Sequence, residues 1–262
     1  MKKLFLCILA WLFYMIPAGI AGADDFLTPQ QRAWITNHGT IKVGMSQYYP
    51  PITFMDKLGE PQGTAVDFWR LLSAKLQFWV QFYPDLFENQ FKGVRSGKYD
   101  SIGAVFALPE RKPFFDFTKP YTTVRTCIYV KPRHAKMKNL SDIKELKVAV
   151  VSGDSGEVLA RKAGLNPSSL PTYREAVFNL SQGDADALIM DEPVVSYFIK
   201  KFDLQKKVVR VGEPVDEDQS TLPVRKGNAM LLGILNRGID LVTKGEWAEI
   251  ERRWLGESRP MK

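Results

Sequence analysis

The feature that most constrains the fold is an order of elements that occurs twice along the chain. A strand, a loop, two helices, a Gly-x-x-Asp turn and a second strand follow one another between residues 41–102 and again between residues 146–188. The two turns are Gly97–Asp100 and Gly183–Asp186. Strands that alternate with helices are typical of α/β units built on parallel sheets. Two α/β lobes are therefore the simplest architecture, although the match is too weak to prove a duplication.

The stretch from Gly97 to Tyr121 combines a helix end, a short apolar strand and a charged turn. Gly97 predicts a helix end, because glycine takes the left-handed cap conformation without steric strain. Residues 101–105 predict one buried strand. The segment 108–113 that follows contains two prolines and cannot continue a sheet, so Arg111 lies just beyond the strand's carboxyl end. Ligands bind at that position in α/β folds.

Two helical segments frame the rest of the chain. Thr28 as a cap and Pro29 at the first helical position predict a helix that ends near Gly39. Residues 229–254 are predicted to be mainly helical, with a break at Gly245. We expect these last helices to return to the first lobe.

The N-terminal residues predict an export signal. Lys2 and Lys3 precede an apolar run over residues 4–20, and Ala21-Gly22-Ala23 follows as a small-x-small cleavage pattern. Residues 1–23 are therefore predicted to be a secretory signal peptide, with an uncleaved membrane anchor as the alternative. Cleavage leaves one cysteine, Cys127, which excludes an internal disulfide in the mature chain.

The charge pattern argues against nucleic-acid binding. The net charge of +7 falls to +5 when the two leader lysines are removed, and the basic residues are interspersed with 29 acids. Nucleic-acid binding proteins usually gather their lysines and arginines into a stripe or patch. Nothing in the sequence implies a metal or an organic cofactor.

Four loops are expected at the carboxyl ends of strands, two from each lobe. They are Ser46–Pro51, Phe106–Arg111, Ser152–Glu157 and Asp191–Pro193. If each lobe is an open α/β sheet, these loops face one another across a cleft.

The side chains on these loops are complementary to a small zwitterion. Arg111 can bind a carboxylate through two parallel hydrogen bonds, and Asp191 can hold an ammonium. Ser155 offers a hydroxyl at a helix start, where backbone amides suit an anion. Tyr48, Tyr49 and Phe87 would supply aromatic walls.

Each of these residues also has a purely structural interpretation. Arg111 could form a surface ion pair with Glu110 or Asp116, and Asp191 could be no more than a helix cap. Ser155 could likewise cap the helix that follows it. The convergence of all four loops is what favours a ligand site.

The chain from Gly39 to Gly256 resembles the family 3 extracellular solute-binding proteins, which are periplasmic binding proteins of the polar amino-acid type. It also resembles their relatives in the sensor regions of BvgS-like kinases, especially in the lead-in LTPQQRAWITNHGTIKVGM. The other motifs that carry the resemblance are TIKVGMSQYYPPI, VRSGKYDSIGA, LPERKPFFDFTKPY, LKVAVVSGDSG, GDADALIMDEPVVSYFI and GEWAEIERRWLG.

The resemblance implies a type II periplasmic binding fold, a two-lobed α/β clamp (Venus flytrap) that closes on its ligand around a two-strand hinge. Residues 24–124 and 221–262 would form lobe 1, and residues 125–220 would form lobe 2. The hinge would lie near residues 123–126 and 216–221. The resemblance further implies a periplasmic monomer that binds a small amino-acid-like or carboxylate-bearing ligand and serves an ABC permease.

The resemblance also assigns residues to the ligand site. The family's carboxylate-binding arginine falls on Arg111, its lobe 2 hydroxyl on Ser155, its ammonium-binding acid on Asp191 and its aromatic clamp on Tyr49 and Phe87. With two further positions, the predicted ligand-binding set is Ser46, Tyr49, Phe87, Phe106, Arg111, Ser155 and Asp191.

Two departures from the family pattern concern the ligand. The family usually has serine or threonine just ahead of the arginine, where this chain has Phe106 and Leu108. An acid often precedes the first-loop aromatic, and Ser46 stands there. These departures favour a more apolar ligand or one that is not an amino acid.

Three other functions are alternatives to transport. Residues 153–156 spell the sequence around a trypsin-like serine nucleophile, but a triad needs a histidine base, and His38 and His134 lie in the lead-in and in a basic linker. A dehydratase on the same clamp would need a poised acid, for which Glu157 or Glu192 are candidates. A ligand-sensing subunit for a membrane kinase or cyclase is the third. We expect a binding protein without catalytic activity.

Overall fold

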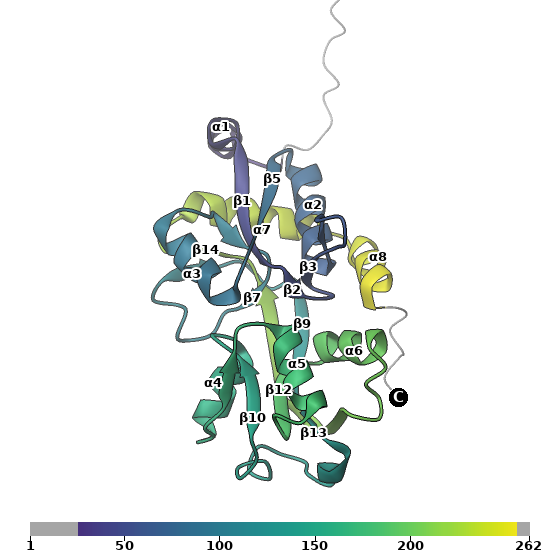
Figure 1. Ribbon diagram of the computed structural model, residues 1–262. Coiled ribbons are helices and arrows are strands. Elements are labelled where there is room, and N and C mark those ends of the chain that lie inside the picture. The colour runs from purple at the N-terminus through teal and green to yellow at the C-terminus, as the bar shows by residue number, and fades with distance from the viewer. Residues whose placement is uncertain (1–25, 256–262) are drawn as a thin grey trace, which may run out of the picture.

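The computed structural model describes residues 26–255, which form two α/β lobes, one above the other in Figure 1. The two-lobed α/β architecture predicted from the sequence is confirmed. The predicted signal peptide, residues 1–23, lies outside the described residues. Each lobe is identified by its own sheet. The lobe boundaries after residues 124 and 220 remain a prediction.

Lobe 1 is built on a five-stranded mixed sheet. Its strand order is β5-β1-β6-β14-β8, and β1 pairs in parallel with both of its neighbours, whereas β14 pairs antiparallel. A small antiparallel sheet of three short strands is inserted after β1. The strands are β1 (Thr40–Ser46), β2 (Tyr48–Tyr49), β3 (Thr53–Met55), β4 (Pro61–Gln62), β5 (Trp79–Asp85), β6 (Ser101–Ile102), β8 (Phe115–Phe117) and β14 (Pro223–Arg225).

Five helices belong to lobe 1 within the described residues: α1 (Pro29–His38), α2 (Thr64–Leu76), α3 (Phe87–Ser96), α7 (Ala229–Leu241) and α8 (Lys244–Leu255). On α2 the apolar side chains at positions 66, 69, 72 and 76 are fully buried, and those at 69, 72 and 76 form the lobe's core with α7. The periodic spacing of those residues therefore predicted both the helix and its buried face.

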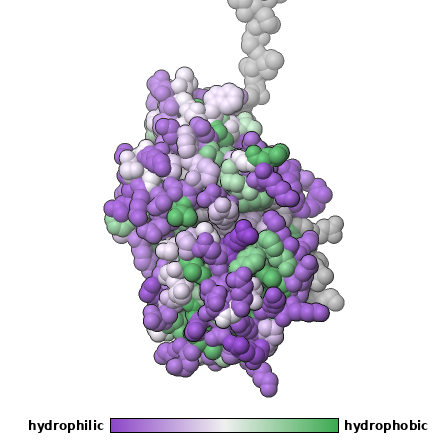
Figure 2. Space-filling model, in the orientation of Figure 1, coloured by the Kyte–Doolittle hydropathy of each residue, from purple (hydrophilic) through white to green (hydrophobic). Residues whose placement is uncertain are grey.

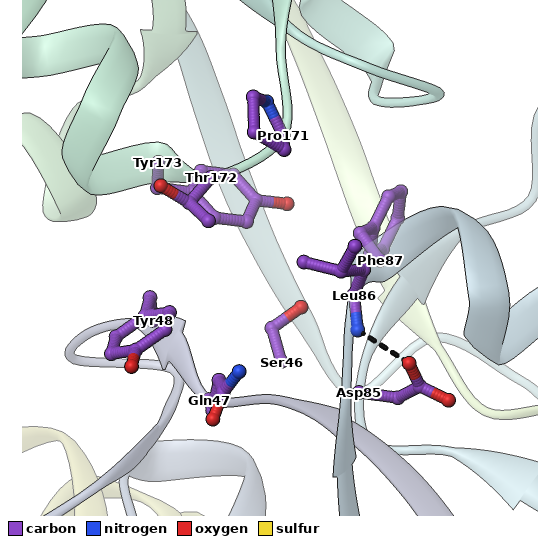
Figure 3. Close-up of a pocket in the computed structure, with 9 residues that line it drawn as sticks. All are labelled: Ser46, Gln47, Tyr48, Asp85, Leu86, Phe87, Pro171, Thr172 and Tyr173. Carbon is purple, nitrogen blue, oxygen red and sulfur yellow. Dashed lines mark hydrogen bonds between the residues drawn. The ribbon is translucent and has the colours of Figure 1, made fainter.

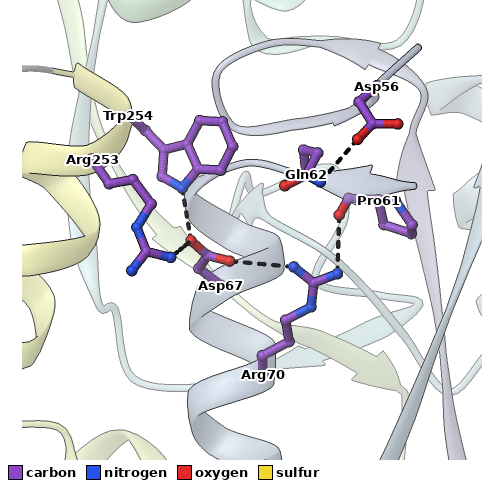
Figure 4. A network of polar contacts seen from close by, with 7 residues as sticks. All are labelled: Asp56, Pro61, Gln62, Asp67, Arg70, Arg253 and Trp254. Atoms are coloured by element: carbon purple, nitrogen blue, oxygen red, sulfur yellow. Dashed lines mark hydrogen bonds and ion pairs between the residues drawn. The ribbon is translucent and has the colours of Figure 1, made fainter. Parts of the chain in front are cut away.

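The C-terminal helix returns to lobe 1, as expected. Arg253 and Trp254 near the end of α8 both donate hydrogen bonds to one carboxylate oxygen of Asp67 on α2, each at 2.9 Å (Figure 4). Arg70 contacts the other oxygen at 3.4 Å. The break between α7 and α8 falls at residues 242–243 rather than at Gly245, because Thr243 and Glu246 form a reciprocal cap at the start of α8.

Lobe 2 is built on a six-stranded sheet with the order β11-β10-β12-β9-β13-β7. The strands β10, β11 and β12 run in parallel, and β9 and β13 are antiparallel to their neighbours. The elements are β7 (Val105–Phe106), β9 (Thr122–Val130), η1 (Pro132–His134), β10 (Val148–Val151), α4 (Ser155–Lys162), β11 (Ser168–Leu170), α5 (Tyr173–Gln182), β12 (Ala187–Asp191), α6 (Glu192–Lys201) and β13 (Val209–Thr221).

Two long strands, β9 and β13, connect the lobes (Figure 1). They pair from Val130 opposite Val209 to Thr122 opposite Ser220, with a bulge between Val211 and Asp216. The segments predicted to be the hinge, 123–126 and 216–221, lie opposite each other in this ladder. A paired ribbon of this kind can bend at its unpaired bulge while its hydrogen bonds hold the lobes together.

The expectation of one buried strand over residues 101–105 is wrong. The chain leaves the first sheet at Gly103, and residues 105–106 pair with Ser220 and Thr221 in the second sheet. The carbonyl of Gly103 accepts a hydrogen bond from the indole of Trp69 at 3.1 Å, which fixes the crossing point. Phe106 is therefore part of a strand that belongs to the sheet of lobe 2.

The visible surface is mainly hydrophilic, with apolar residues in small separate patches (Figure 2). Over residues 26–255, no helix combines the length and the apolar character that a membrane crossing requires.

Candidate functional site

The predicted loops meet between the lobes. Lobe 1 contributes the end of β1, its following turn and the start of α3, and lobe 2 contributes the start of α5 (Figure 3). Tyr48 and Leu86 face Thr172 and Tyr173 across this gap, whose cavity measures only about 10 Å³. A second cavity of about 10 Å³ lies between Arg111, Asp154 and three aromatic rings. Each cavity holds about one water molecule, so the clamp is closed in this structure.

Asp191 lies at the N-terminal end of α6 but makes no capping bond there. Its side chain is 1% exposed and accepts hydrogen bonds from the hydroxyls of Thr126, at 2.9 Å, and Tyr49. Because Tyr49 follows β1, this contact joins the two lobes. Burial and then the charge of Asp154 raise the pKa of Asp191 to about 7. A cap role does not explain this geometry.

Arg111 is only 8% exposed, so it is not a surface residue. Its two terminal nitrogens donate to the carbonyls of Phe106, at 3.0 Å, and of Gly153 in lobe 2, at 2.9 Å. Its guanidinium lies over the rings of Phe91 and Phe87, at 4.8 and 5.6 Å from their centroids. The acids suggested as its partners pair elsewhere, with Lys162 and Lys226. Burial lowers the pKa of Arg111, and the guanidinium still carries its charge.

Ser155 is the first residue of α4, and Asp154 is the cap of that helix. The Asp154 carboxylate accepts from the amide of Ser155 at 2.8 Å, whereas the buried Ser155 hydroxyl has no hydrogen-bond partner among the described residues. Gly156 brings the helix start against β12, because a Cβ there would lie 2.6 Å from the carbonyl of Ile189. The predicted hydroxyl is therefore buried beside Asp154, and it lines neither of the two small cavities described above.

Aromatic rings from both lobes lie together at this place: the predicted Tyr49 and Phe87, and Tyr173, which was not predicted. Tyr49 stacks on Tyr173 with centroids 4.2 Å apart, and Phe87 meets the same ring edge-on at 6.4 Å. The Tyr173 hydroxyl is buried beside Asp154 without a well-formed hydrogen bond. Burial and the Asp154 charge raise the pKa of Tyr173.

Ser46 lines the outer cavity and Phe106 the inner one in this closed structure. The hydroxyl of Ser46 accepts a hydrogen bond from Gln90 on α3 at 3.0 Å. Phe106 lines the inner cavity and holds Arg111 through its backbone carbonyl.

Two acids of the site were not predicted. Asp154 lines the inner cavity at 6% exposure, and burial raises its pKa against the opposing charge of Arg111. Asp218 on β13 is half-buried, with one carboxylate oxygen enclosed and unpartnered. Asp154 lies in the predicted loop Ser152–Glu157, where the sequence analysis assigns Ser155, and not Asp154, to the ligand site. The charged run around Asp218 gave no comparable signal.

A much larger hollow lies elsewhere, between α6, α8 and the start of β9. It measures about 820 Å³ and contains none of the predicted site residues. Two of its cations are already paired, Arg125 with Glu192 at 2.7 Å and Arg253 with Asp67 at 2.9 Å. The described residues contain no group of three metal-ligating side chains that could hold an ion.

Comparisons with known proteins agree with this geometry. The sequence model of bacterial extracellular solute-binding proteins, family 3, matches residues 41–257. The L-cystine-binding protein TcyA of Bacillus subtilis is 25% identical over 86% of this chain and 84% of its own length. The virulence sensor protein BvgS of Bordetella bronchiseptica is 23% identical over 94% of this chain, which spans only 20% of BvgS.

A solved structure of an ancestral arginine-binding protein bound to glutamine superposes with a TM-score of 0.77. It is 31% identical and covers 84% of this chain and 99% of its own. The two-lobed clamp with the type II periplasmic binding fold is thereby confirmed. The chain belongs to the family 3 bacterial extracellular solute-binding proteins.

Proposed function

We propose that this protein captures a small amino-acid-like ligand between its lobes and delivers it to an ABC permease. The observation that carries the proposal is the placement of Arg111 and Asp191. Both are buried in the interlobe site, they come from different lobes, and each already contacts the opposite lobe. A ligand that binds both groups would hold the clamp closed.

Each lobe can bind one of the two charged groups of a zwitterion. Arg111 uses two of its five N–H donors on backbone carbonyls, which leaves three for a ligand carboxylate. Asp191 can exchange the Tyr49 hydroxyl for a ligand ammonium. The stacked rings of Tyr49 and Tyr173 would cover the ligand's apolar part.

Calorimetric titration with amino acids, amines and small carboxylates tests the proposal. We expect Arg111→Ala to weaken the best ligand by roughly 2–5 kcal/mol, as truncation of a buried charged contact does. Arg95→Ala is the matched control, because Arg95 is an exposed arginine of the same lobe. A variant that keeps its affinity but melts at a much lower temperature would show that Arg111 is structural.

Delivery to a permease and export to the periplasm extend the same proposal. The predicted leader and the extracellular class of the family support them. The similarity to BvgS supports sensing as the alternative. Uptake of labelled ligand by cells with and without the gene distinguishes them, since a sensor subunit leaves uptake unchanged.

The alternative function, a dehydratase, cannot use Glu157 or Glu192, the two acids that the sequence suggests for it. Glu157 is held by Arg161 and the Glu192 carboxylate by Arg125 and Arg210, so neither is poised. Asp191, with its pKa near 7, is the acid that could exchange protons. Product analysis after incubation with a cyclohexadienyl acid tests for dehydratase activity. Turnover of this acid would show that the protein is an enzyme and would overturn the binding proposal.

A further inference from the structure

The hollow between α6, α8 and the start of β9 is separate from the amino-acid site proposed above. Thr126 of β9 donates to Asp191 in that site. The adjoining residues, Arg125 and Glu192, pair with each other in the hollow. Successive side chains of a strand point to opposite faces of its sheet, so the hollow and the amino-acid site lie on opposite sides of β9. Among the described residues, none lines both the hollow and one of the two small cavities.

Both lobes contribute walls to this hollow. Tyr197 comes from α6 of lobe 2 and Trp254 from α8 of lobe 1, and the two helices lie on the same side of the molecule (Figure 1). The ring of Phe54 in lobe 1 contacts both of these rings, at centroid distances of 6.1 and 5.5 Å. The indole N–H of Trp254 donates to Asp67, which holds the ring in place (Figure 4). A molecule in the hollow would therefore contact both lobes and two aromatic rings of fixed position.

Positive charges outnumber negative ones around the hollow. Arg125 and Arg210 share the carboxylate of Glu192, at 2.7 and 3.3 Å. Arg253, on the wall from lobe 1, shares Asp67 with a second arginine of α2, at 2.9 and 3.4 Å. Each carboxylate compensates only one of the two guanidinium charges beside it. Each of these two groups therefore keeps one positive charge.

Two lysines of α6 add to this surplus. Lys200 and Lys201 are exposed and line the hollow. Lys201 contacts the hydroxyl of Tyr197 at 2.7 Å, and neither lysine forms an ion pair with an acid in the described part of the chain. Lysine and arginine bind phosphate and carboxylate oxygens through charge-assisted hydrogen bonds. The surplus therefore favours a ligand with more than one negative charge.

We propose that this hollow is a second ligand site, which binds a small organic anion that carries at least two negative charges and a planar ring. Its volume of about 820 Å³ lies in the range of small-molecule sites. The charged groups of the anion would lie against Lys200, Lys201 and Arg253. Its planar ring would stack on Tyr197 or Trp254.

ADP, pyrophosphate and adenosine are suitable probes, because ADP combines the charge with the ring and each of the other two has one of these features. They are titrated calorimetrically into the full mature protein at low ionic strength, without added metal. ADP should bind at least about 10-fold more tightly than pyrophosphate, as stacking of one base contributes, and adenosine should show no saturable binding. Added salt should weaken the binding of ADP, because it screens exposed charges.

A pair of double variants tests the position of the site. Lys200→Gln with Lys201→Gln should weaken ADP binding at least about 10-fold, because two charged contacts are lost. Lys206→Gln with Lys207→Gln is the matched control, since it removes the same charge at two exposed lysines of lobe 2 outside the hollow. The control should keep the affinity of the wild type. Equal losses in the two double variants would show that ADP responds only to overall charge, and would overturn the inference.

Arg111→Ala distinguishes this site from the amino-acid site. It should leave ADP binding unchanged, because Arg111 does not line the hollow. Loss of ADP binding in this variant would place ADP in the amino-acid site and overturn the inference. Absence of ADP binding, or equal affinity for ADP and pyrophosphate, would overturn it as well. Failure to bind any amino acid would overturn the proposed function alone, since the second site does not depend on it.

Discussion

Replacing Asp191 with asparagine should stabilise the ligand-free protein, and the gain should grow with pH. Burial, followed by the charge of Asp154, raises the pKa of Asp191 from 3.8 to about 7. The unfolded chain ionises this group near its ordinary value, so the folded state binds more protons between about pH 4 and 7. The free energy of unfolding of the wild type therefore falls through this range, by about 1.4 kcal/mol per pH unit and about 4 kcal/mol in total.

Asparagine removes the charge while it keeps the shape and the contacts. Its oxygen can still accept from Thr126, and its amide can donate to the hydroxyl of Tyr49, which is able to act as an acceptor. The variant should therefore be nearly as stable as the wild type at pH 4. Above pH 4 its free energy of unfolding should not fall as that of the wild type does.

Urea denaturation without ligand, at steps from pH 4 to 8.5 and constant ionic strength, measures the effect. We expect the stability difference between variant and wild type to be smallest at pH 4 and to level off above pH 7. Asp184→Asn, at an exposed acid of the same lobe, should give a difference that does not vary with pH. A difference for Asp191→Asn that is flat across the range would refute the reasoning.

Three further predictions concern packing and closure. A Cβ at Gly93 would overlap the ring of Tyr99, so Gly93→Ala should lower the free energy of unfolding by roughly 1–3 kcal/mol in a urea titration. Asp67→Asn weakens both contacts from α8 and should lower stability by about 1 kcal/mol, with faster amide exchange in α8 and unchanged exchange in lobe 2. Tyr49→Phe removes the interlobe hydrogen bond to Asp191 and should shift the ligand-free protein toward an open form, seen as a larger radius of gyration in small-angle scattering.

Elements with a complete local signal were predictable. Thr28 and Gln31 form the capping box that starts α1, and Gly97 ends α3 in the left-handed conformation. Thr243 and Glu246 carry the same kind of box, and reading it would have placed the start of α8 correctly. Short-range spacing contains this information because each cap is a contact between neighbouring residues.

Elements defined by distant pairing were not predictable. The strand β13 extends through a charged run to Thr221, where its pairing with β9 and, at residues 220–221, with β7 keeps it extended. The separation of residues 101–105 into two sheets depends on the same strand. In the site, Arg111 and Asp191 follow from loop position, whereas Tyr173 enters because α5 of lobe 2 lies against Tyr49 of lobe 1. No local pattern records such a contact.

The buried acids link stability to ligand choice. In the ligand-free clamp the charge of Asp154 raises the pKa of Asp191, so closing the lobes above pH 7 encloses two carboxylates against one guanidinium. A ligand cation beside either acid lowers its pKa and removes part of this repulsion. The stabilisation of the closed form by such a cation should be largest at pH values where both acids are ionised.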